Sequence, residues 1–474
     1  MGSFGFRVLS LGGQMIIYRV VEKDVVGLYR AMVLIHLMAL ALLPFGLDSL
    51  LVREKSRRAR YVAACSQALA LIGGGLALGT LVLALVPHVG ASSFLGGWLT
   101  VGDDWPALLL MPLIFAVQAV KLSIRGSLAA RLDFKKISIG EFGNGLITWI
   151  GGGIVALALA KAWPLMAMYL AGEVFECWWL FRREPFRPAS ILRPSRFSIL
   201  KRLVKRHLGY CTFNTADLTL NNVASLLPGV LFVAWISKGA TADYSVALQL
   251  LVLPVMLLSG ALWRVTFPTI SGVPDPELHR RCLAIIAGAA AFIAPAVLWF
   301  AFFAPSNVYL LAGGAFVETA TPIVRWMAIY MVLVAVYTPI SSLDMVRDRS
   351  EVGLLWNIVY TGGRVAIIWW LAPDGLLAVV AGIGIFSMAM WVANAAILGW
   401  LLGAGWGRYL AATLRLVPAL GVYAGGLWLC IAATQGHLLW GPLLSVLPAI
   451  VYTVLLWRFH PEQFRLLMRL AGRR

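Results

Sequence analysis

Long apolar segments alternate with short polar segments along the whole chain. A helix that crosses the hydrocarbon core of a bilayer needs about 20 consecutive, mostly apolar residues. Segments of this kind predict fourteen spanning helices, near residues 4–21, 28–51, 61–87, 105–127, 139–160, 162–181, 208–236, 242–268, 281–304, 320–343, 351–372, 376–402, 409–433 and 437–458. The first is the weakest, because it is short and contains Arg7 and Gln14. The pattern therefore predicts an all-α, polytopic membrane protein.

Composition supports this interpretation. The 474 residues are 61% hydrophobic and only 13% charged, which leaves too little polar surface for a soluble protein of this length. The net charge is +18, but the basic residues form short clusters between apolar segments, a pattern typical of topology signals and not of nucleic-acid binding. The five cysteines include no C-x-x-C pair, and the six histidines lack zinc-binding spacing. We therefore expect no metal ion, cofactor or nucleic acid.

The loops predict the orientation of the chain. Basic clusters such as "VREKSRRAR", "RLDFKK", "DPELHRR" and "VRDRSE" follow the even-numbered spans, whereas the loops between them are nearly free of Lys and Arg. Lys and Arg are enriched on the cytoplasmic side of membrane proteins. Both termini are therefore predicted to be cytoplasmic.

The longest basic loop divides the predicted helices into groups. Residues 182–207 carry nine Lys and Arg against a single Glu, a composition that favours contact with anionic lipids of the inner leaflet. Six spans precede this loop and six follow it, so the two sixes have the same orientation, as parallel repeats do. The predicted organisation is an N-terminal lobe (1–182), a basic linker (183–207), a C-terminal lobe (208–402), and helices 13 and 14 with a basic tail (403–474).

Several segments also resemble a known family. "DYSVALQLLVLP", "FPTIS", "ARLDFKK" followed by "GEFGNGLITWIGGGIVALAL", and "LLAGGAFVETATPIVRWMAI" are similar to Wzx-type polysaccharide-export flippases, relatives of MurJ-type flippases and MATE exporters. The resemblance implies two six-helix lobes around a central cavity and the movement of an undecaprenyl-diphosphate-linked oligosaccharide across the inner membrane for exopolysaccharide, capsule or O-antigen synthesis. A polysaccharide polymerase and chain-length machinery are further candidate partners. The sequence departs from many relatives at Pro228-Gly229, where they carry an acidic residue late in span seven.

Basic residues inside the spans are the candidate substrate site. An ionised side chain deep in hydrocarbon costs at least about 2.5–3.5 kcal/mol, so it must face a cavity or a partner. Arg364 lies about 13 residues, or roughly 20 Å, into its span, too deep to reach the head groups cheaply. Such cations can bind a diphosphate, and Arg can do so bidentately. The candidates are Arg364, Arg325, Lys121, Arg125, Arg53, Arg264, Arg19 and Arg30.

Some of these cations also have an ordinary explanation. Snorkelling to the head groups is favoured over substrate binding for Arg53, Arg125 and Arg264, which lie near the ends of their spans. For Arg325 and Lys121 the two interpretations are balanced. Arg19 and Arg30 flank the first outward loop, where they either receive substrate or lie at the interface.

Acidic residues inside the spans allow two roles. Glu173 and Glu176 lie three apart on one face of span six, and Asp217 lies in span seven. Either group is a proton or Na⁺ coupling site, or it balances the charge of the basic residues. The second role is slightly favoured for Asp217, and the two stay open for Glu173.

Two other functions compete with a flippase. A drug or cation antiporter would favour acidic residues along the substrate path and few deep cations, unlike this chain. A membrane glycosyltransferase or polymerase usually needs a large outer loop with catalytic residues, whereas the predicted outer loops have at most about twenty residues and contain no catalytic constellation. We therefore expect a transporter and not an enzyme.

Overall fold

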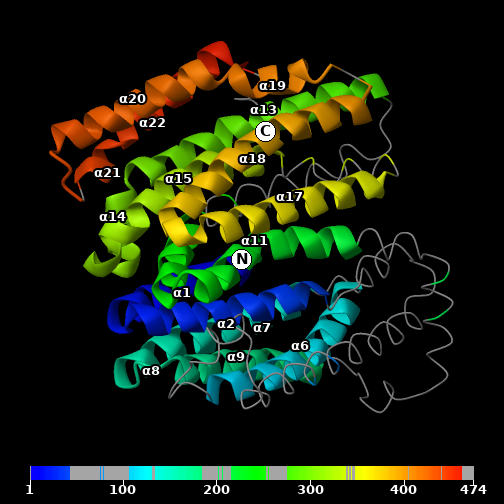
Figure 1. Cartoon of the computed structure of the whole chain (residues 1–474), viewed down its shortest axis with the longest axis vertical. Coiled ribbons are helices and arrows are strands. Elements are labelled where there is room, and N and C mark those ends of the chain that lie inside the picture. Colours follow the sequence, from blue (N-terminus) through cyan, green and yellow to red (C-terminus); the bar gives the residue numbers. More distant parts are fainter. Residues whose placement is uncertain are drawn as a thin grey trace. The chain divides into compact units, whose positions relative to one another are not determined.

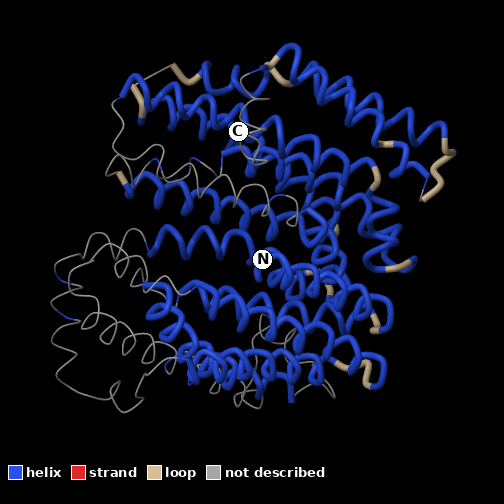
Figure 2. Tube along the Cα trace, turned by 180° about the vertical axis from the view of Figure 1, so that it is seen from behind, coloured by secondary structure: helices blue, strands red, loops and turns tan. Residues whose placement is uncertain are grey.

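In the computed structural model, most of the described residues are helical. The described residues are 2–42, 75, 78, 106–130, 134–183, 201, 205, 215–251, 255, 275–337, 340, 343, 347, 349–403, 405–438 and 440–461. Figure 2 shows helices joined by short loops, with no strand among the described residues. The predicted all-α fold class is confirmed.

The chain forms two compact units, residues 1–242 and 243–474. Unit 1 contains α1 (Gly2–Val20), α2 (Lys23–Leu42), α6 (Pro106–Ala130), α7 (Phe134–Gly145), the π-helix η3 (Leu146–Gly151), α8 (Gly152–Ala158), α9 (Ala162–Arg183) and α11 (Thr215–Trp235). Helix α9 packs against α6 and α7, and α11 packs against α2. The predicted C-terminal lobe began at residue 208, so α11 lies on the other side of the division found in the structure.

Helix α1 lies unusually close to η3. A Cβ atom on Gly13 would overlap the carbonyl oxygen of Trp149, so only glycine allows the two backbones to meet there. The predicted span 139–160 is one continuous helical stretch built from α7, η3 and α8. Its π-helical segment widens one turn, a local departure from the α-helix that apolar periodicity does not report.

Unit 2 is a bundle of long apolar helices. It contains α13 (Asp275–Phe302), α14 (Ala304–Ala312), η6 (Gly314–Phe316), α15 (Val317–Tyr337), α17 (Ser350–Leu371), η8 (Ala372–Asp374), α18 (Leu376–Leu401), α19 (Gly407–Leu414), α20 (Val417–Ala433), α21 (Trp440–Leu444) and α22 (Val446–Phe459). Figure 1 shows α13, α15, α18 and α17 running along one another, and their contacts follow the order α13–α15–α18–α17. Helices α20 and α22 form a pair that packs on α13 through α20.

Three hydrogen bonds fix the last helices to α13. His279 Nδ1 lies 2.6 Å from the Tyr409 hydroxyl, and the Tyr452 hydroxyl donates to the carbonyl oxygen of Ala291 over 2.9 Å. Trp299 Nε1 donates to Ser445 Oγ over 2.8 Å. Apolar residues of α13, α20 and α22 also pack into one hydrophobic core. Helices α19 to α22 are therefore an integral part of unit 2.

The spans agree with the predicted segments in most places. Among the described residues, six helices are long and apolar enough to cross a bilayer, and all six lie in unit 2. Residues 43–74 and 256–274, which hold parts of spans two, three and eight, lie outside the described residues. The count of fourteen stays a prediction.

Two segments between predicted spans are helical in the structure. The segment "DPELHRR", predicted to be a loop, forms the first turns of α13, where Arg281 Nη2 donates to Glu277 Oε1 over 2.5 Å across one helical turn. The segment after span nine contains α14, which ends at Gly313 with φ 84°. The predicted span 409–433 agrees with the candidate span Gly407–Ala433, within which α19 ends at Leu414 and α20 begins at Val417.

Replacing Tyr452 with Phe tests how the last helices are held. The change removes the hydroxyl that bonds to the Ala291 carbonyl and leaves the aromatic ring in the core. We expect the free energy of unfolding to fall by about 0.5–1.5 kcal/mol, measured by unfolding of the purified protein in detergent with increasing SDS. Thr453→Ala is the control, because Thr453 is exposed and bonds only within its own helix. Equal effects of the two variants would contradict the role of Tyr452.

Candidate functional site

The first candidate site is a buried group of charges in unit 1, which we call the lysine–glutamate cluster: Lys121, Arg125, Glu141, Asn144, Glu173 and Glu176. Lys121 Nζ bonds to Glu173 Oε2 and lies 3.2 Å from Glu176 Oε2. These three side chains are at most 5% exposed. Arg125 pairs with Glu141 and lies 3.6 Å from Glu176 Oε1. The structure therefore brings together four of the predicted site residues.

Asn144 completes the cluster and is held in a defined orientation. Thr148 Oγ1 donates to Asn144 Oδ1 over 2.8 Å, which turns the amide nitrogen toward the acids. Asn144 Nδ2 then donates to Glu173 Oε1 over 3.0 Å and to Glu176 Oε2 over 2.8 Å. Each glutamate thus has both a cation and an amide within reach.

Helical spacing explains how these side chains meet. Lys121 and Arg125 are four residues apart on α6, and Glu173 and Glu176 are three apart on α9, so each pair shares one face. Helices α6 and α9 pack against each other, and α7 supplies Glu141 and Asn144. The cluster has three carboxylates and two cations, so one negative charge is in surplus when all five are ionised.

The second candidate site, the arginine–tyrosine cluster, lies in unit 2 and consists of Arg364, Tyr244, Tyr330 and Tyr360. Arg364 is 5% exposed. Its guanidinium carbon lies 5.3 Å from the ring centre of Tyr360 and 5.9 Å from that of Tyr330, and Tyr244 is close enough to interact with it electrostatically. Tyr360 in turn lies 3.2 Å from Ser387 Oγ of α18. Aromatic rings and hydroxyls therefore surround a cation deep within a predicted span.

Arg30 sits in a similar aromatic setting in unit 1. It is 9% exposed, and its guanidinium carbon lies 5.1 Å from the ring centre of Tyr18 and 5.5 Å from that of Trp149. Arg30 was predicted to receive substrate outside or to lie at the interface. The structure buries it between α1, α2 and η3.

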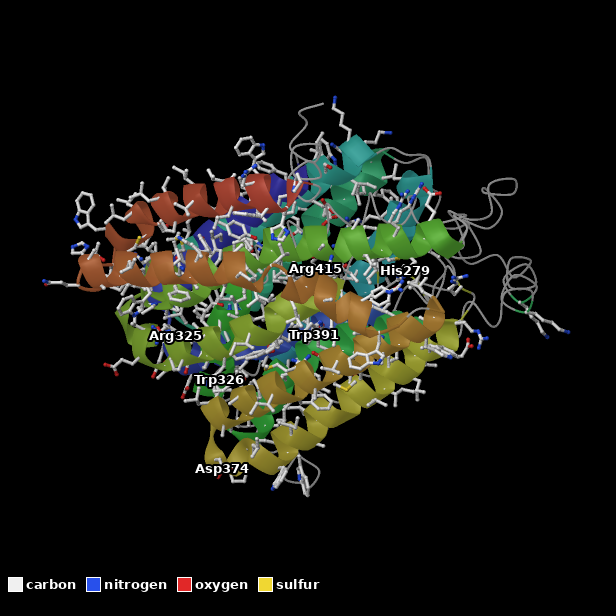
Figure 3. The ribbon with its side chains drawn as sticks, turned by 90° about the horizontal axis from the view of Figure 1, so that it is seen from above. His279, Arg325, Trp326, Asp374, Trp391 and Arg415 are labelled. Carbon is white, nitrogen blue, oxygen red and sulfur yellow. The ribbon has the colours of Figure 1, made fainter. Side chains whose placement is uncertain are left out.

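The remaining predicted residues are not gathered into these clusters. Arg325, labelled in Figure 3, is exposed on α15, and Arg19 is exposed at the end of α1. Asp217 is partly buried on α11. Arg53 and Arg264 lie outside the described residues.

Sequence reasoning missed the neutral partners of the charged residues. Asn144, Tyr244, Tyr330 and Tyr360 carry no charge, and nothing marks them within apolar spans. One signal was present: Tyr360 and Arg364 are four residues apart, so they share a face of α17. No group of three His, Cys, Asp or Glu side chains that could hold a metal ion occurs among the described residues.

Comparison with known proteins identifies the family. The sequence profile of the polysaccharide biosynthesis protein family matches residues 16–321, well over half of the chain. The chain belongs to this family. This family member is 23% identical over 363 residues to "Lipopolysaccharide biosynthesis protein WzxC" of Escherichia coli (strain K12), covering 74% of this chain and 69% of that protein. The resemblance to Wzx-type proteins is thereby confirmed.

Solved structures share the fold of this family member. "Lipid II flippase MurJ, inward closed conformation" superposes with a TM-score of 0.72 at 11% identity, covering 96% of this chain and 98% of that one. An inward-facing multidrug resistance MATE family transporter of the MOP superfamily superposes with a TM-score of 0.62 at 14% identity, covering 87% of this chain and 95% of that one. The polysaccharide biosynthesis family member is therefore a multi-pass membrane protein with a MurJ- and MATE-like fold.

Replacing Lys121 with Met tests the balance of charge in the lysine–glutamate cluster. The change leaves Glu173 and Glu176 buried without their ammonium partner. We expect a loss of about 3–5 kcal/mol in the free energy of unfolding, measured by SDS-induced unfolding in detergent. The triple variant Lys121→Met/Glu173→Gln/Glu176→Gln removes all three charges and should recover most of this loss. A neutral effect of Lys121→Met would show that the cluster is not ionised as described.

Replacing Gly172 with Ala tests the close approach that positions Asn144. A Cβ atom there would fall 2.5 Å from Asn144 Oδ1 and closer still to Thr148 Oγ1. We expect overpacking to lower the free energy of unfolding by about 1–3 kcal/mol in the same assay. Gly362→Ala on α17 is the matched control, since open space surrounds its Cβ position, and it should leave stability unchanged or raised. Equal stability of both variants would contradict this packing.

Proposed function

We propose that this protein is a flippase that moves an undecaprenyl-diphosphate-linked oligosaccharide from the cytoplasmic to the outer leaflet of a bacterial inner membrane, by alternating access of two lobes. Membership of the polysaccharide biosynthesis family and the relation to a lipopolysaccharide biosynthesis protein support the substrate class. The likeness in fold to a lipid II flippase supports the movement of a lipid-linked molecule. The proposal also keeps both termini in the cytoplasm.

The observation that carries this proposal is the buried Arg364. A guanidinium in the middle of an apolar helix is costly to maintain, and this one is buried beside the rings of Tyr330 and Tyr360. A diphosphate supplies oxygen acceptors that match the fork of an arginine, and tyrosine hydroxyls can donate further hydrogen bonds to it. We assign the recognition of the diphosphate to Arg364.

The other cations divide by their surroundings. Lys121 and Arg125 pair with carboxylates, so we assign them to the charge balance of the lysine–glutamate cluster. Arg325 and Arg19 are exposed, where they can attract an anionic substrate without desolvation. Contact of Arg53, Arg264 and Arg30 with substrate stays a prediction.

Replacing Arg364 with Ala tests the flippase. In a bacterial strain that depends on this protein for polysaccharide export, we expect export to fall at least about tenfold. This is the effect expected from the loss of at least one charge-assisted hydrogen bond to the substrate. Lipid-linked repeat units should accumulate on the cytoplasmic side. Arg364→Lys should restore only part of the activity, because it keeps the charge but loses the bidentate fork.

Arg349→Ala is the control for that experiment. Arg349 lies at the start of the same helix but is exposed, with a long 3.9 Å pair to Glu351. Size-exclusion chromatography would confirm that the variants fold. Normal export by a folded Arg364→Ala protein would remove the proposed site, and unchanged lipid-linked repeat units in a strain without the protein would remove the function.

The triple variant of the lysine–glutamate cluster distinguishes a coupling role from charge balance. If Glu173 and Glu176 only balance Lys121, the folded variant Lys121→Met/Glu173→Gln/Glu176→Gln should export polysaccharide within about fivefold of the original protein, since a shift of under 1 kcal/mol in a barrier changes rates by less than about fivefold. If the acids carry a coupling proton or Na⁺, the variant should fold and yet fail to export. We propose the first outcome, because each acid already has a cation and an amide partner.

A drug or cation antiporter is the second candidate, supported by the likeness in fold to a MATE family transporter. An antiporter for organic cations would have to tolerate Arg364, whose positive charge opposes such a substrate. Efflux of organic cations by the purified protein in liposomes, without movement of lipid-linked sugars, would favour this alternative over the flippase.

A further inference from the structure

Unit 2 contains a cavity of about 750 Å³ whose lining includes no residue of the arginine–tyrosine cluster. We call it the arginine pocket. Its basic lining residues are Arg280 at the start of α13, Arg408 in the first turn of α19, and Arg415 just after α19. Figure 3 labels Arg415 and, on α13, His279, the residue before Arg280. Three segments that are far apart in the sequence thus place a guanidinium on one cavity.

The three arginines of the pocket have no acidic partner among the described residues. None of its three arginines makes an ion pair or a side-chain hydrogen bond in the described part of the chain. The neighbouring Arg281 differs, because it pairs with Glu277 one turn away. Three unbalanced positive charges beside one cavity make a site for an anion.

Apart from His460, the other side chains that line the cavity are apolar. Leu283, Ala284 and Ala287 line the cavity from α13, and Ala411, Ala412 and Leu416 line it from the other wall. A free phosphate ion would gain nothing from these surfaces. A ligand with an anionic head and hydrocarbon chains can occupy both parts of the cavity.

The position of the pocket fits the surface of a membrane. Trp406 is 52% exposed beside the pocket, and Phe459, which lines it, is 69% exposed. Exposed aromatic side chains of membrane proteins collect at the level of the head groups. Residues 275–280, 403–408 and 459–461 belong to loops or ends predicted to be cytoplasmic, and Arg415 lies in the first turns of the predicted span that follows Arg408.

Internal hydrogen bonds hold the walls of the pocket in place. His279 and Tyr409 bond across 2.6 Å and fix α19 to α13 next to Arg280 and Arg408. Tyr409 is completely buried. The arginines therefore extend from anchored helices, which reduces the entropy lost when a ligand binds.

We propose that the arginine pocket binds the phosphate head group of an anionic phospholipid of the cytoplasmic leaflet, with its acyl chains along the apolar wall. Basic pockets between helices on the cytoplasmic side are suited to such head groups. A bound lipid would join the ends of α13, α19 and α22, because residues of all three line the cavity. This site is separate from the proposed flippase site and does not depend on that function.

Native mass spectrometry of the full-length protein in detergent tests this proposal. We expect phosphatidylglycerol to bind more tightly than phosphatidylcholine. The variant Arg280→Ala/Arg408→Ala/Arg415→Ala lacks these charges and should bind phosphatidylglycerol roughly a hundredfold more weakly. Each basic residue near a membrane surface contributes about fivefold to the affinity for anionic lipid. Arg458→Ala is the matched control, because Arg458 is an exposed arginine at the same end of α22 that does not line the pocket.

Other outcomes would overturn the proposal. Unchanged phosphatidylglycerol binding by the triple variant, or equal binding of phosphatidylcholine, would show that the arginines do not recognise the head group. Displacement of phosphatidylglycerol by a low concentration of undecaprenyl diphosphate would show that the pocket belongs to the transported lipid. If the triple variant fails to fold, each single variant should still lose about fivefold in affinity, and unchanged affinity in all three would exclude the site.

Discussion

Buried charge in an apolar solvent is the constraint on which this structure depends. The chain places ionisable side chains inside helices that are otherwise mostly apolar. Burying such a group costs little free energy only where neighbouring groups replace its contacts with water. In unit 1, Lys121 lies between Glu173 and Glu176, and Asn144 bonds to both acids. The packing of α6, α7 and α9 is therefore tied to this network as well as to apolar contacts.

The two units stabilise their cations by different means. Carboxylates surround Lys121, so the attraction is strong but leaves little capacity for another anion. The aromatic rings of Tyr330 and Tyr360 lie beside Arg364 and lower the cost of burying its charge.

The sequence predicts the helices well because length and hydrophobicity are local properties. The segment 376–402 became α18 with nearly the same bounds. Helix α14 was missed because nine residues are too few to register as a span, and the start of α13 was missed because charged residues there form a helical turn. Charges inside spans were also visible, but not their partners: Lys121 and Glu173 are 52 positions apart, and only the packing of α6 on α9 joins them.

The contact between Gly13 and Trp149 has a consequence for movement within unit 1. Because the two backbones touch, α1 cannot turn about its own axis without displacing the wide helical turn that carries Trp149. The indole ring of Trp149 also lies beside the guanidinium of Arg30. Displacing Trp149 would therefore remove an aromatic contact from a buried cation. The N-terminal helix and the second helix are thus linked through one residue, Trp149, whose backbone contacts α1 and whose indole ring contacts Arg30 of α2.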